Sequence, residues 1–426
     1  MASKNPVGAA GQQGPRVRSD CWIEVETRPS GGLDISLQSK VAGLYGQSIE
    51  DLVREGCQTM GVAHAKVTVV DQGALPFVLG ARLEAAVRRA GHEPAATFLL
   101  PSADHCAYTS RRDRLRRSRL YLPGNEPKFY PNSGLHGPDA VILDLEDSVA
   151  PSEKDAARCL VRNALRAVDF YGAERMVRIN QGEQGLEDLA WLVPHNVHLI
   201  LIPKVEDVLD VVEVDRRIAA LSQQADVGSP VYLMPIIESA AGAWRAFEIA
   251  AASPNVVGVA IGLEDYTADI GAQRTLQGTE SFWARAQVLN GARAAGVQPI
   301  DTVFSDVTDM DGLRAAVAEA NGLGFVGKGC IHPRQIPVVH EAFAPDEQEI
   351  ERATRIVLAF EAAEAQGLGV VSLGSKMIDA PVVKRAVALV EQAILVGKLT
   401  DDWREELSGD KPGARLNGRL NEKGDA

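Results

Sequence analysis

The stretch VYLMPIIESAAGAW (Val231–Trp244) places a carboxylate, Glu238, directly after a run of strand-forming apolar residues. Small residues follow, and they lead into a helical pattern. A strand that ends in a polar residue and turns at once into a helix is the repeating unit of α/β folds. We therefore expect further units of this kind on both sides of the stretch.

Short apolar runs of the same type recur seven more times, with helical stretches between them. The eight runs lie at 118–124, 139–147, 175–180, 198–204, 231–239, 256–265, 298–306 and 324–333. Eight strands separated by helices over this length predict an α/β fold, the (β/α)8 TIM barrel. An open, doubly wound sheet is the rival fold, but no G-x-G-x-x-G and no P-loop sequence follows any of the runs.

The remaining segments suggest further parts around the barrel. Strand-like alternation in CWIEVE and LDISLQS, followed by helical stretches, predicts a small α+β domain before it. Gly-rich or polar ends of the chain are expected to be disordered. The expected division is a disordered segment at 1–15, the small domain at 16–91, a linker at 92–116, the barrel at 117–340, a C-terminal helical extension or lid at 341–400, and a polar tail at 401–426.

The bulk composition is that of a globular enzyme or binding protein. The 426 residues are 46% hydrophobic, and a formal net charge of −13 argues against nucleic acid and anionic membranes as partners. The five cysteines include no C-x-x-C pair, no apolar segment reaches the ~18 residues of a membrane span, and the N-terminus lacks an apolar signal core. These features predict a cytoplasmic protein.

One basic run, SRRDRLRRSR (Ser110–Arg119), departs from the acidic balance of the chain. A charge run of this kind is usually a solvated face, here a face of the linker. The alternative is contact with the phosphates of a large anionic cofactor.

Charged residues follow seven of the eight predicted strands. They are Asp144, Glu146, Asp147, Arg178, Lys204, Glu238, Glu264, Asp265, Asp301, Asp306, Lys328 and His332. The carboxyl ends of barrel strands meet on one face, where TIM-barrel active sites form. Solvent contact alone would explain one charged end but not seven, so we expect a catalytic site on that face.

Glu238 and Asp265 end the fifth and sixth predicted strands, which are neighbours. Adjacent strands stand about 4.8 Å apart, and two carboxylates that close repel each other unless a proton or a cation lies between them. Carboxylates with open positions suit a hard cation such as Mg²⁺ or Mn²⁺. The alternatives are a dyad that shares one proton, or salt bridges to Arg178 and Lys204.

Arg178 carries a planar guanidinium suited to bidentate binding of a substrate carboxylate or phosphate. The alternative is a structural ion pair with Glu146 or Asp147. Lys204 and Lys328 also leave open a Schiff-base mechanism, which would require a desolvated amine.

The segment from about Arg116 to Val387 resembles the citrate lyase β-subunit family, within the wider group of malyl-CoA/citramalyl-CoA lyases and HpcH/HpaI-type aldolases. The matching motifs occur in the family order. They are RSRLYLPGNEP, VILDLEDSVAPSEKDAAR, VRIN, IPKVE, IIESAAG, IGLEDYTADIG, QPIDTVFSD, GFVGKGCIHPRQI and SKMIDAP.

This resemblance implies a (β/α)8 barrel that assembles as a trimer or a hexamer of trimers. It implies Mg²⁺ bound by Glu238 and Asp265, and a substrate carboxylate bound by Arg178 with Glu238 nearby. It further implies that Asp379 of KMIDAP reaches the site of a neighbouring subunit, and that the arginines near 112–119 lie where the phosphates of CoA bind.

The small N-terminal domain resembles a different family, the acyl carrier (γ) subunit of citrate lyase. The best match is VVDQGALPFVLGARLEAA (Val69–Ala86). That family attaches a phosphoribosyl-dephospho-CoA arm to a Ser shortly before an Asp. Anchoring on Asp20 places Arg18 at the Ser position, with Ser19 one residue later, so covalent carriage requires a one-residue gap.

The resulting functional prediction is a Mg²⁺-dependent carbon–carbon lyase. It would cleave a citryl, citramalyl or malyl thioester by a retro-aldol reaction into a 2-keto acid and an acetyl thioester, with Asp379 as the candidate acid/base. One alternative is an acyl carrier or scaffold that recruits an acyltransferase (α-like) subunit. Another is a regulatory barrel without activity.

Overall fold

The computed structural model describes residues 5–365, 371–373 and 376–408. It divides the chain into two compact units, one ending at His340 and one beginning at Glu341. Each unit is considered by itself below.

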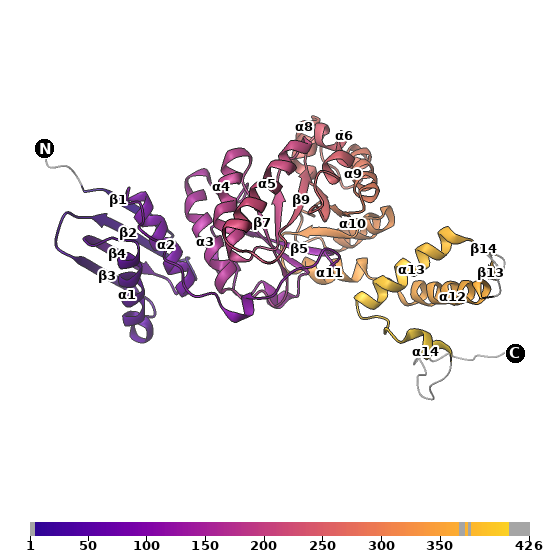
Figure 1. Ribbon diagram of the computed structural model, residues 1–426, viewed down its shortest axis with the longest axis horizontal. Helices are drawn as coiled ribbons and strands as arrows, with labels where there is room; N and C mark the ends of the chain where they lie inside the picture. Colours follow the sequence, from indigo (N-terminus) through magenta and orange to yellow (C-terminus); the bar gives the residue numbers. More distant parts are fainter. Residues whose placement is uncertain (1–4, 366–370, 374–375, 409–426) are drawn as a thin grey trace. The chain divides into compact units, whose positions relative to one another are not determined.

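In the described part of the chain, the first unit contains a closed barrel of eight parallel strands (Figure 1). Strand neighbours are consecutive in sequence, and the last strand pairs with the first. The predicted TIM barrel is therefore confirmed. Its strands are β5 (Ser118–Pro123), β6 (Ala140–Asp144), β7 (Glu174–Arg178), β8 (Leu199–Ile202), β9 (Tyr232–Ile237), β10 (Gly258–Ile261), β11 (Gln298–Asp301) and β12 (Gly327–Cys330).

Helices surround the strands, so both faces of each strand are buried. The barrel core is an apolar cluster to which Ile142, Met176, Leu201, Met234 and Ile300 belong. The surrounding helices are α3 (Lys154–Ala167), α4 (Gly182–Leu192), α5 (Val208–Gln224), α6 (Ala240–Trp244), α7 (Ala246–Ala250), α8 (Leu263–Asp269), α9 (Phe282–Ala294), α10 (Met310–Leu323) and α11 (Gln335–Phe343).

A four-stranded sheet in the order β1-β2-β4-β3 precedes the barrel. Its elements are β1 (Val7–Gly11), β2 (Cys21–Thr27), β3 (Leu33–Ser39), β4 (Ala65–Asp71), α1 (Ala42–Thr59) and α2 (Pro76–Arg89). The expectation of disorder throughout 1–15 is wrong, because β1 pairs antiparallel with β2. The strand was not predicted because its residues are small. A Cβ on Gly8 would lie 2.2 Å from the Ala90 nitrogen, so only glycine lets β1 approach the end of α2 this closely.

Buried polar contacts hold α2 of this sheet against α3 of the barrel. The Glu84 carboxylate lies 2.6 Å from the Arg162 guanidinium, and both side chains are almost fully buried. The Asn163 side chain donates to the Phe77 carbonyl. Within the first unit the small domain is therefore fixed to the barrel by contacts that need defined geometry to offset their desolvation.

Three arginines of the basic run make contacts at the amino ends of the barrel strands. Arg116 makes two bonds of 2.7 and 2.8 Å to Glu174, the first residue of β7. Arg117 pairs with Asp139 just before β6, and Arg112 donates to the Val256 carbonyl just before β10. These contacts lie at the amino ends of the strands, opposite the face where TIM-barrel sites form. The run is therefore divided: Arg116 and Arg117 form ion pairs, Arg111 and Arg112 are exposed as the solvated-face interpretation expects, and Arg119 lines the cavity at the carboxyl ends of the strands.

The second unit is built on α12 (Glu347–Glu364) and α13 (Ala380–Leu395), which pack through a shared apolar cluster. The short strands β13 (Val371–Leu373) and β14 (Lys376–Ile378) pair antiparallel, where a helix was expected. The predicted tail begins with α14 (Trp403–Ser408), whose Trp403 is buried in that cluster, and its remainder, 409–426, lies outside the described residues. Among the helices of the described residues, none is long and apolar enough to cross a membrane.

Candidate active site at the carboxyl ends of the barrel strands

A cavity of about 450 Å³ lies at the carboxyl ends of the barrel strands. It brings together three of the four predicted site residues, Arg178, Glu238 and Asp265. Its wall also includes Arg119, Tyr121, Asp144, Asp147, Ser148, Gly262, Glu264, Asp301, Thr302 and Ile331. The expected catalytic face is therefore a real concave site.

Glu238 follows β9 and is only 6% exposed. In the described residues, its Oε2 atom is buried and has no hydrogen-bond partner. Gly262 provides the space for this carboxylate, since a Cβ there would lie 2.8 Å from Oε1. Burial raises the pKa of Glu238 to about 8 and outweighs the opposing effect of the Arg178 charge. Such a carboxylate requires a proton or a cation beside it.

Asp265 lies in the first turn of α8 and is about half exposed. Its carboxylate lies 3.7 Å from Lys204 Nζ. The salt-bridge alternative therefore holds for Asp265, whereas Glu238 has no such partner within the described residues.

The pair also fits a hard cation. One buried carboxylate with a free oxygen and one exposed carboxylate face the same cavity. Among the residues that the structure describes, no group of three or more His, Cys, Asp or Glu side chains forms a metal site. Two carboxylates alone suit Mg²⁺, which keeps several waters and takes the rest of its ligands from substrate.

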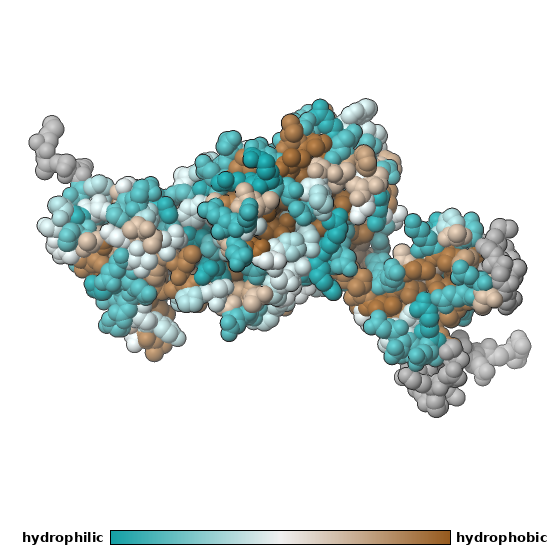
Figure 2. Space-filling model, viewed as in Figure 1, coloured by the Kyte–Doolittle hydropathy of each residue, from teal (hydrophilic) through white to brown (hydrophobic). Residues whose placement is uncertain are grey.

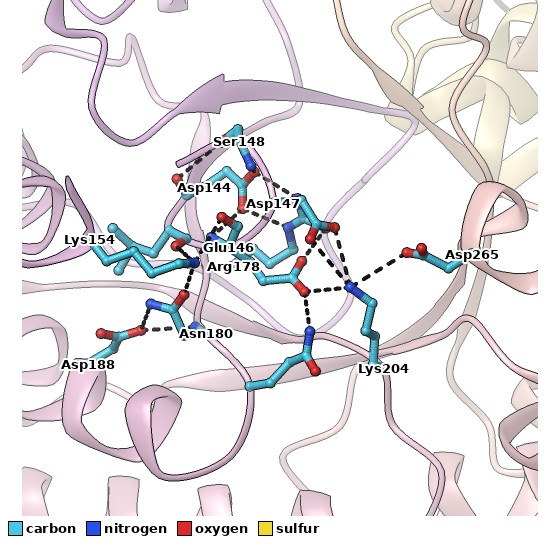
Figure 3. A network of polar contacts seen from close by, with 12 residues as sticks. Asp144, Glu146, Asp147, Ser148, Lys154, Arg178, Asn180, Asp188, Lys204 and Asp265 are labelled. Atoms are coloured by element: carbon cyan, nitrogen blue, oxygen red, sulfur yellow. Dashed lines mark hydrogen bonds and ion pairs between the residues drawn. The ribbon is translucent and has the colours of Figure 1, made fainter. Parts of the chain in front are cut away.

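Arg178 is the centre of a network of carboxylates (Figure 3). Its Nε and Nη2 atoms donate to the two oxygens of Asp144 at 2.6 and 2.7 Å, and Nη1 lies 2.7 Å from Glu146. Burial opposes the charge, but the bonds to Asp144 prevail and the pKa of Arg178 is raised. The structural ion pair considered from the sequence is present, with Asp144 as an unforeseen main partner. It fixes a guanidinium on the cavity wall.

The two lysines do not suit a Schiff base. Lys204 Nζ donates to Glu146 at 2.8 Å. Burial lowers the pKa of Lys204, but Glu146, Asp147 and Asp265 together raise it further, so the net shift is upward. Lys328 Nζ lies 2.7 Å from Asp301, which also pairs with Arg285 of α9. An iminium mechanism needs an amine whose charge is destabilised, and both amines instead lie against carboxylates.

The other predicted strand-end residues make local contacts. Glu264 pairs with Arg274, and Asp306 accepts bonds from Thr308. His332 lies in a loop, where its Nδ1 accepts from the Arg334 amide.

Asp379, the fourth predicted site residue, belongs to the second unit. It is exposed and caps α13 by accepting from the Val382 amide at 3.3 Å.

Among the cavity residues that sequence reasoning missed are two large polar side chains of β5, Arg119 and Tyr121. This strand ends without a charge, so it contributed nothing to the list of strand ends, and Arg119 was counted in the basic run. The available signal was the alternation in SRLYLP, which places Arg119 and Tyr121 on the face opposite Leu120 and Leu122.

The predicted carrier position lies in the loop before β2. Asp20 accepts two bonds from Arg82, at 3.0 and 2.9 Å, and both side chains are buried. Ser19 has a φ of +55° and donates its amide to the Gln72 carbonyl, and Arg18 is exposed. The anchoring aspartate therefore has a structural partner in this chain.

Comparison with known proteins agrees with both parts of the first unit. The family model HpcH/HpaI aldolase/citrate lyase matches residues 117–333, and a carrier-protein model described as malonate decarboxylase delta subunit matches residues 11–90. The β subunit of citrate lyase from Haemophilus influenzae is 41% identical over 66% of this chain and 97% of its own length. An L-malyl-CoA/β-methylmalyl-CoA lyase from Cereibacter sphaeroides is 33% identical over 66% of this chain and 96% of its own.

Among solved structures, CitE from Mycobacterium tuberculosis in complex with magnesium, acetoacetate and coenzyme A aligns with a TM-score of 0.54 and 30% identity. The alignment covers 66% of this chain and 99% of that one. Taken with the closed barrel and its acidic cavity, these matches show that the chain belongs to the HpcH/HpaI aldolase/citrate lyase family.

Proposed function

We propose that the chain is a Mg²⁺-dependent carbon–carbon lyase that cleaves a 3-hydroxyacyl-CoA thioester into a 2-keto acid and an acetyl thioester. Its relatives include a citrate lyase subunit and a malyl-CoA lyase, and the CitE complex holds magnesium and coenzyme A. The observation that carries the proposal is the buried, unpartnered Glu238 oxygen in one cavity with Asp265 and Arg178.

Glu238 and Asp265 would hold the cation, with Mn²⁺ as an alternative to Mg²⁺. A divalent cation at this position lowers the pKa of the substrate hydroxyl and stabilises the ketone that replaces it. Arg178, oriented by Asp144, would bind the carboxylate next to that hydroxyl.

The reaction then needs one proton removed and one supplied. Loss of the hydroxyl proton lets the C–C bond break, which releases the keto acid and leaves a thioester enolate that takes up a proton. The thioester carbonyl delocalises the enolate charge, so no Schiff base is required. Asp379 of a neighbouring copy is the proposed acid/base.

The barrel surface offers a place for contact between copies. Trp244 of α6 and Trp283 of α9 are 73% and 48% exposed, and their rings lie 5.7 Å apart. Phe247 and Phe282 are exposed as well, and Figure 2 shows hydrophobic surface beside α6 and α8. Exposed apolar patches of this kind mark protein contacts. We propose that they support a trimer or a larger homo-oligomer.

The direct test is a panel of citryl-CoA, citramalyl-CoA and malyl-CoA, followed by detection of oxaloacetate, pyruvate or glyoxylate. We expect cleavage in Mg²⁺ and none in excess EDTA. Cleavage that EDTA leaves unchanged would exclude the metal mechanism.

The role of Asp379 has a separate test. Glu238→Gln and Asp379→Asn chains should each be inactive, while co-expression of the two should restore part of the activity, because mixed oligomers contain intact composite sites. Failure of mixed oligomers to recover activity would place Asp379 outside the site.

A further inference from the structure

We propose that Arg119 is a second anion-binding residue deep in the catalytic cavity, and that it selects a substrate whose hydroxy-acid half carries an additional carboxylate. The inference rests on the proposed function and narrows its substrate class. Retro-aldol cleavage of such a thioester releases a dicarboxylic 2-keto acid of the oxaloacetate type, together with the acetyl thioester. Citramalyl and malyl thioesters would instead release pyruvate and glyoxylate, which carry one carboxylate.

The Arg119 side chain lies inside the barrel. The residue is 1% exposed and pairs with Ala140 of β6 and Gly329 of β12. A Cβ on Gly329 would lie 2.6 Å from Val303 Cγ1 and 3.3 Å from the Tyr121 ring, so the absence of a side chain there lets these two residues pack next to β12. Arg119 Nη1 donates to Met234 Sδ at 3.2 Å, and Met234 belongs to the apolar cluster that fills the barrel.

This guanidinium lacks the partners that a buried charge needs. A thioether sulfur is a weak acceptor, and within the described residues Arg119 Nε has no acceptor at all. The carboxylate of Asp301 is already bound by Arg285 and Lys328. A buried cation without a counter-ion is costly and is retained where it has a use.

The other buried arginines show what a structural arginine looks like in this chain. Within the described residues, each of the four that form ion pairs has its own carboxylate: Arg82 with Asp20, Arg116 with Glu174, Arg162 with Glu84 and Arg285 with Asp301. Arg175 has no carboxylate but donates to the carbonyls of Leu165 and Tyr108. Arg119 has neither kind of partner, and it lines the same cavity as Glu238.

The cavity spans the distance between Arg119 and the catalytic carboxylates. Met234, which Arg119 contacts, and Glu238 lie on the same face of β9, four residues or about 13 Å apart along the strand. The Arg119 side chain at one end, the Glu238 side chain at the other and a small organic acid between them can fill this distance of about 13 Å. Tyr121 continues the wall above Arg119, with its ring 5.6 Å from the Arg178 guanidinium.

The charges indicate which acid fits. Arg178 is already surrounded by Asp144, Glu146 and Asp147, so it offers one orienting contact rather than excess positive charge. Arg119 supplies an uncompensated positive charge deeper in the cavity. A carboxymethyl arm on the substrate would pair with it, whereas a methyl group or a hydrogen would leave it unpaired, and sites with unpaired buried polar groups discriminate strongly.

The test compares kcat/KM for the three CoA thioesters in wild type, Arg119→Met and Arg119→Lys. We expect wild type to prefer citryl-CoA, Arg119→Met to lose roughly 100-fold on citryl-CoA with little change on the other two, and Arg119→Lys to retain part of the preference. The proposal is overturned if Arg119→Met lowers all three values equally or leaves the preference unchanged.

A binding experiment separates this inference from the proposed reaction. The affinities of oxaloacetate and pyruvate for the full chain are measured by calorimetry in Mg²⁺. We expect oxaloacetate to bind more tightly to wild type, with the difference lost in Arg119→Met. If no thioester is cleaved but this pattern holds, the reaction fails and the role of Arg119 stands; equal affinities in wild type refute that role.

Stability supplies the control against a purely structural role. Arg119→Met should melt at the same or a higher temperature, because it removes an unpaired buried charge. Met234→Leu changes the shape of the same place without changing charge, and it should preserve the preference for citryl-CoA. A lower melting temperature of Arg119→Met with an unchanged ligand preference would make Arg119 a core residue. If Arg119→Met does not fold, the same measurements on Arg119→Lys decide.

Discussion

The two ends of the barrel are both rich in charge, but they differ in how completely the charges are paired. At the amino ends of the strands, Arg116 and Arg117 have carboxylate partners within 3 Å, and Arg112 donates to backbone carbonyls. In the cavity at the carboxyl ends, Glu238 Oε2 and Arg119 Nε have no partner within the described residues, although Arg119 enters that cavity from the second position of β5. Arg175 Nε, near the amino ends, also lacks a partner, but its other guanidinium nitrogens donate to the Leu165 and Tyr108 carbonyls. Charge density alone therefore does not locate the site. Buried charged groups that lack a charged partner and also line a cavity do, because such groups do not contribute to stability.

The largest effect should come from Glu238. Glu238→Gln is expected to reduce kcat/KM by about 10³-fold or more, since a metal contributes several kcal/mol to the transition state. The melting temperature should hold or rise, because an amide of the same shape takes the place of a buried carboxyl group whose ionised form is costly there. Steady-state kinetics in Mg²⁺ together with thermal unfolding check both parts. If Glu238→Gln does not fold, Glu238 contributes to stability, as the paired charges at the amino ends of the strands do.

Breaking an ion pair at the amino ends of the strands should lower stability and leave turnover unchanged, the opposite of the result expected for Glu238→Gln. Glu174→Gln leaves the buried Arg116 charge without its counter-ion and should lower the free energy of unfolding by about 3–5 kcal/mol. The kcat of the folded protein should stay the same, because the change is at the other end of the barrel. Denaturant titration measures the free energy of unfolding, and kinetics normalised to the concentration of folded protein measure kcat. The double variant Arg116→Met/Glu174→Leu, which removes both charges, should recover much of the loss.

The pH dependence of stability should reveal the unpartnered carboxylate. The pKa of Glu238 is raised from its ordinary 4.5 to about 8, so between these values the folded protein binds more protons than the unfolded chain. In EDTA, stability should therefore fall as pH rises from about 5 to 8, and the fall should be shallower in Glu238→Gln. Adding Mg²⁺ at pH 8 should restore the stability of the wild-type protein. Parallel pH profiles for the two proteins in EDTA would contradict this.

The smallest effect is expected at the carrier loop. Ser19 has a left-handed backbone, so Ser19→Gly should stabilise the protein by about 1 kcal/mol at most and leave turnover unchanged. Intact mass should equal that of the unmodified chain. A mass increase that disappears in Ser19→Gly would instead restore covalent carriage to this domain.

Much of the site was predictable because barrel strands are local signals. Runs such as MPIIE and VAIGLED indicate both a strand and the charged residue that follows it. Parallel barrel strands bring their carboxyl ends together, so Glu238, Asp265 and Arg178 were expected in one cavity. The β1 strand was not predictable in this way. Its residues VGAAG carry little apolar surface, and the strand forms because the β2 edge and α2 accept its backbone.

The sequence by itself determined the barrel, the face that carries the site, and the carboxylates and arginine brought to it, because alternation and strand ends depend on residues next to each other in the chain. Only the tertiary structure decided which charges are paired. Arg116 meets Glu174 from 58 positions away, whereas Arg119, three residues later, points into the barrel and meets a methionine sulfur. Contacts between distant segments set the pairing. Two arginines of one run therefore differ: Arg116 forms an ion pair between strands, and Arg119 lines the proposed anion site.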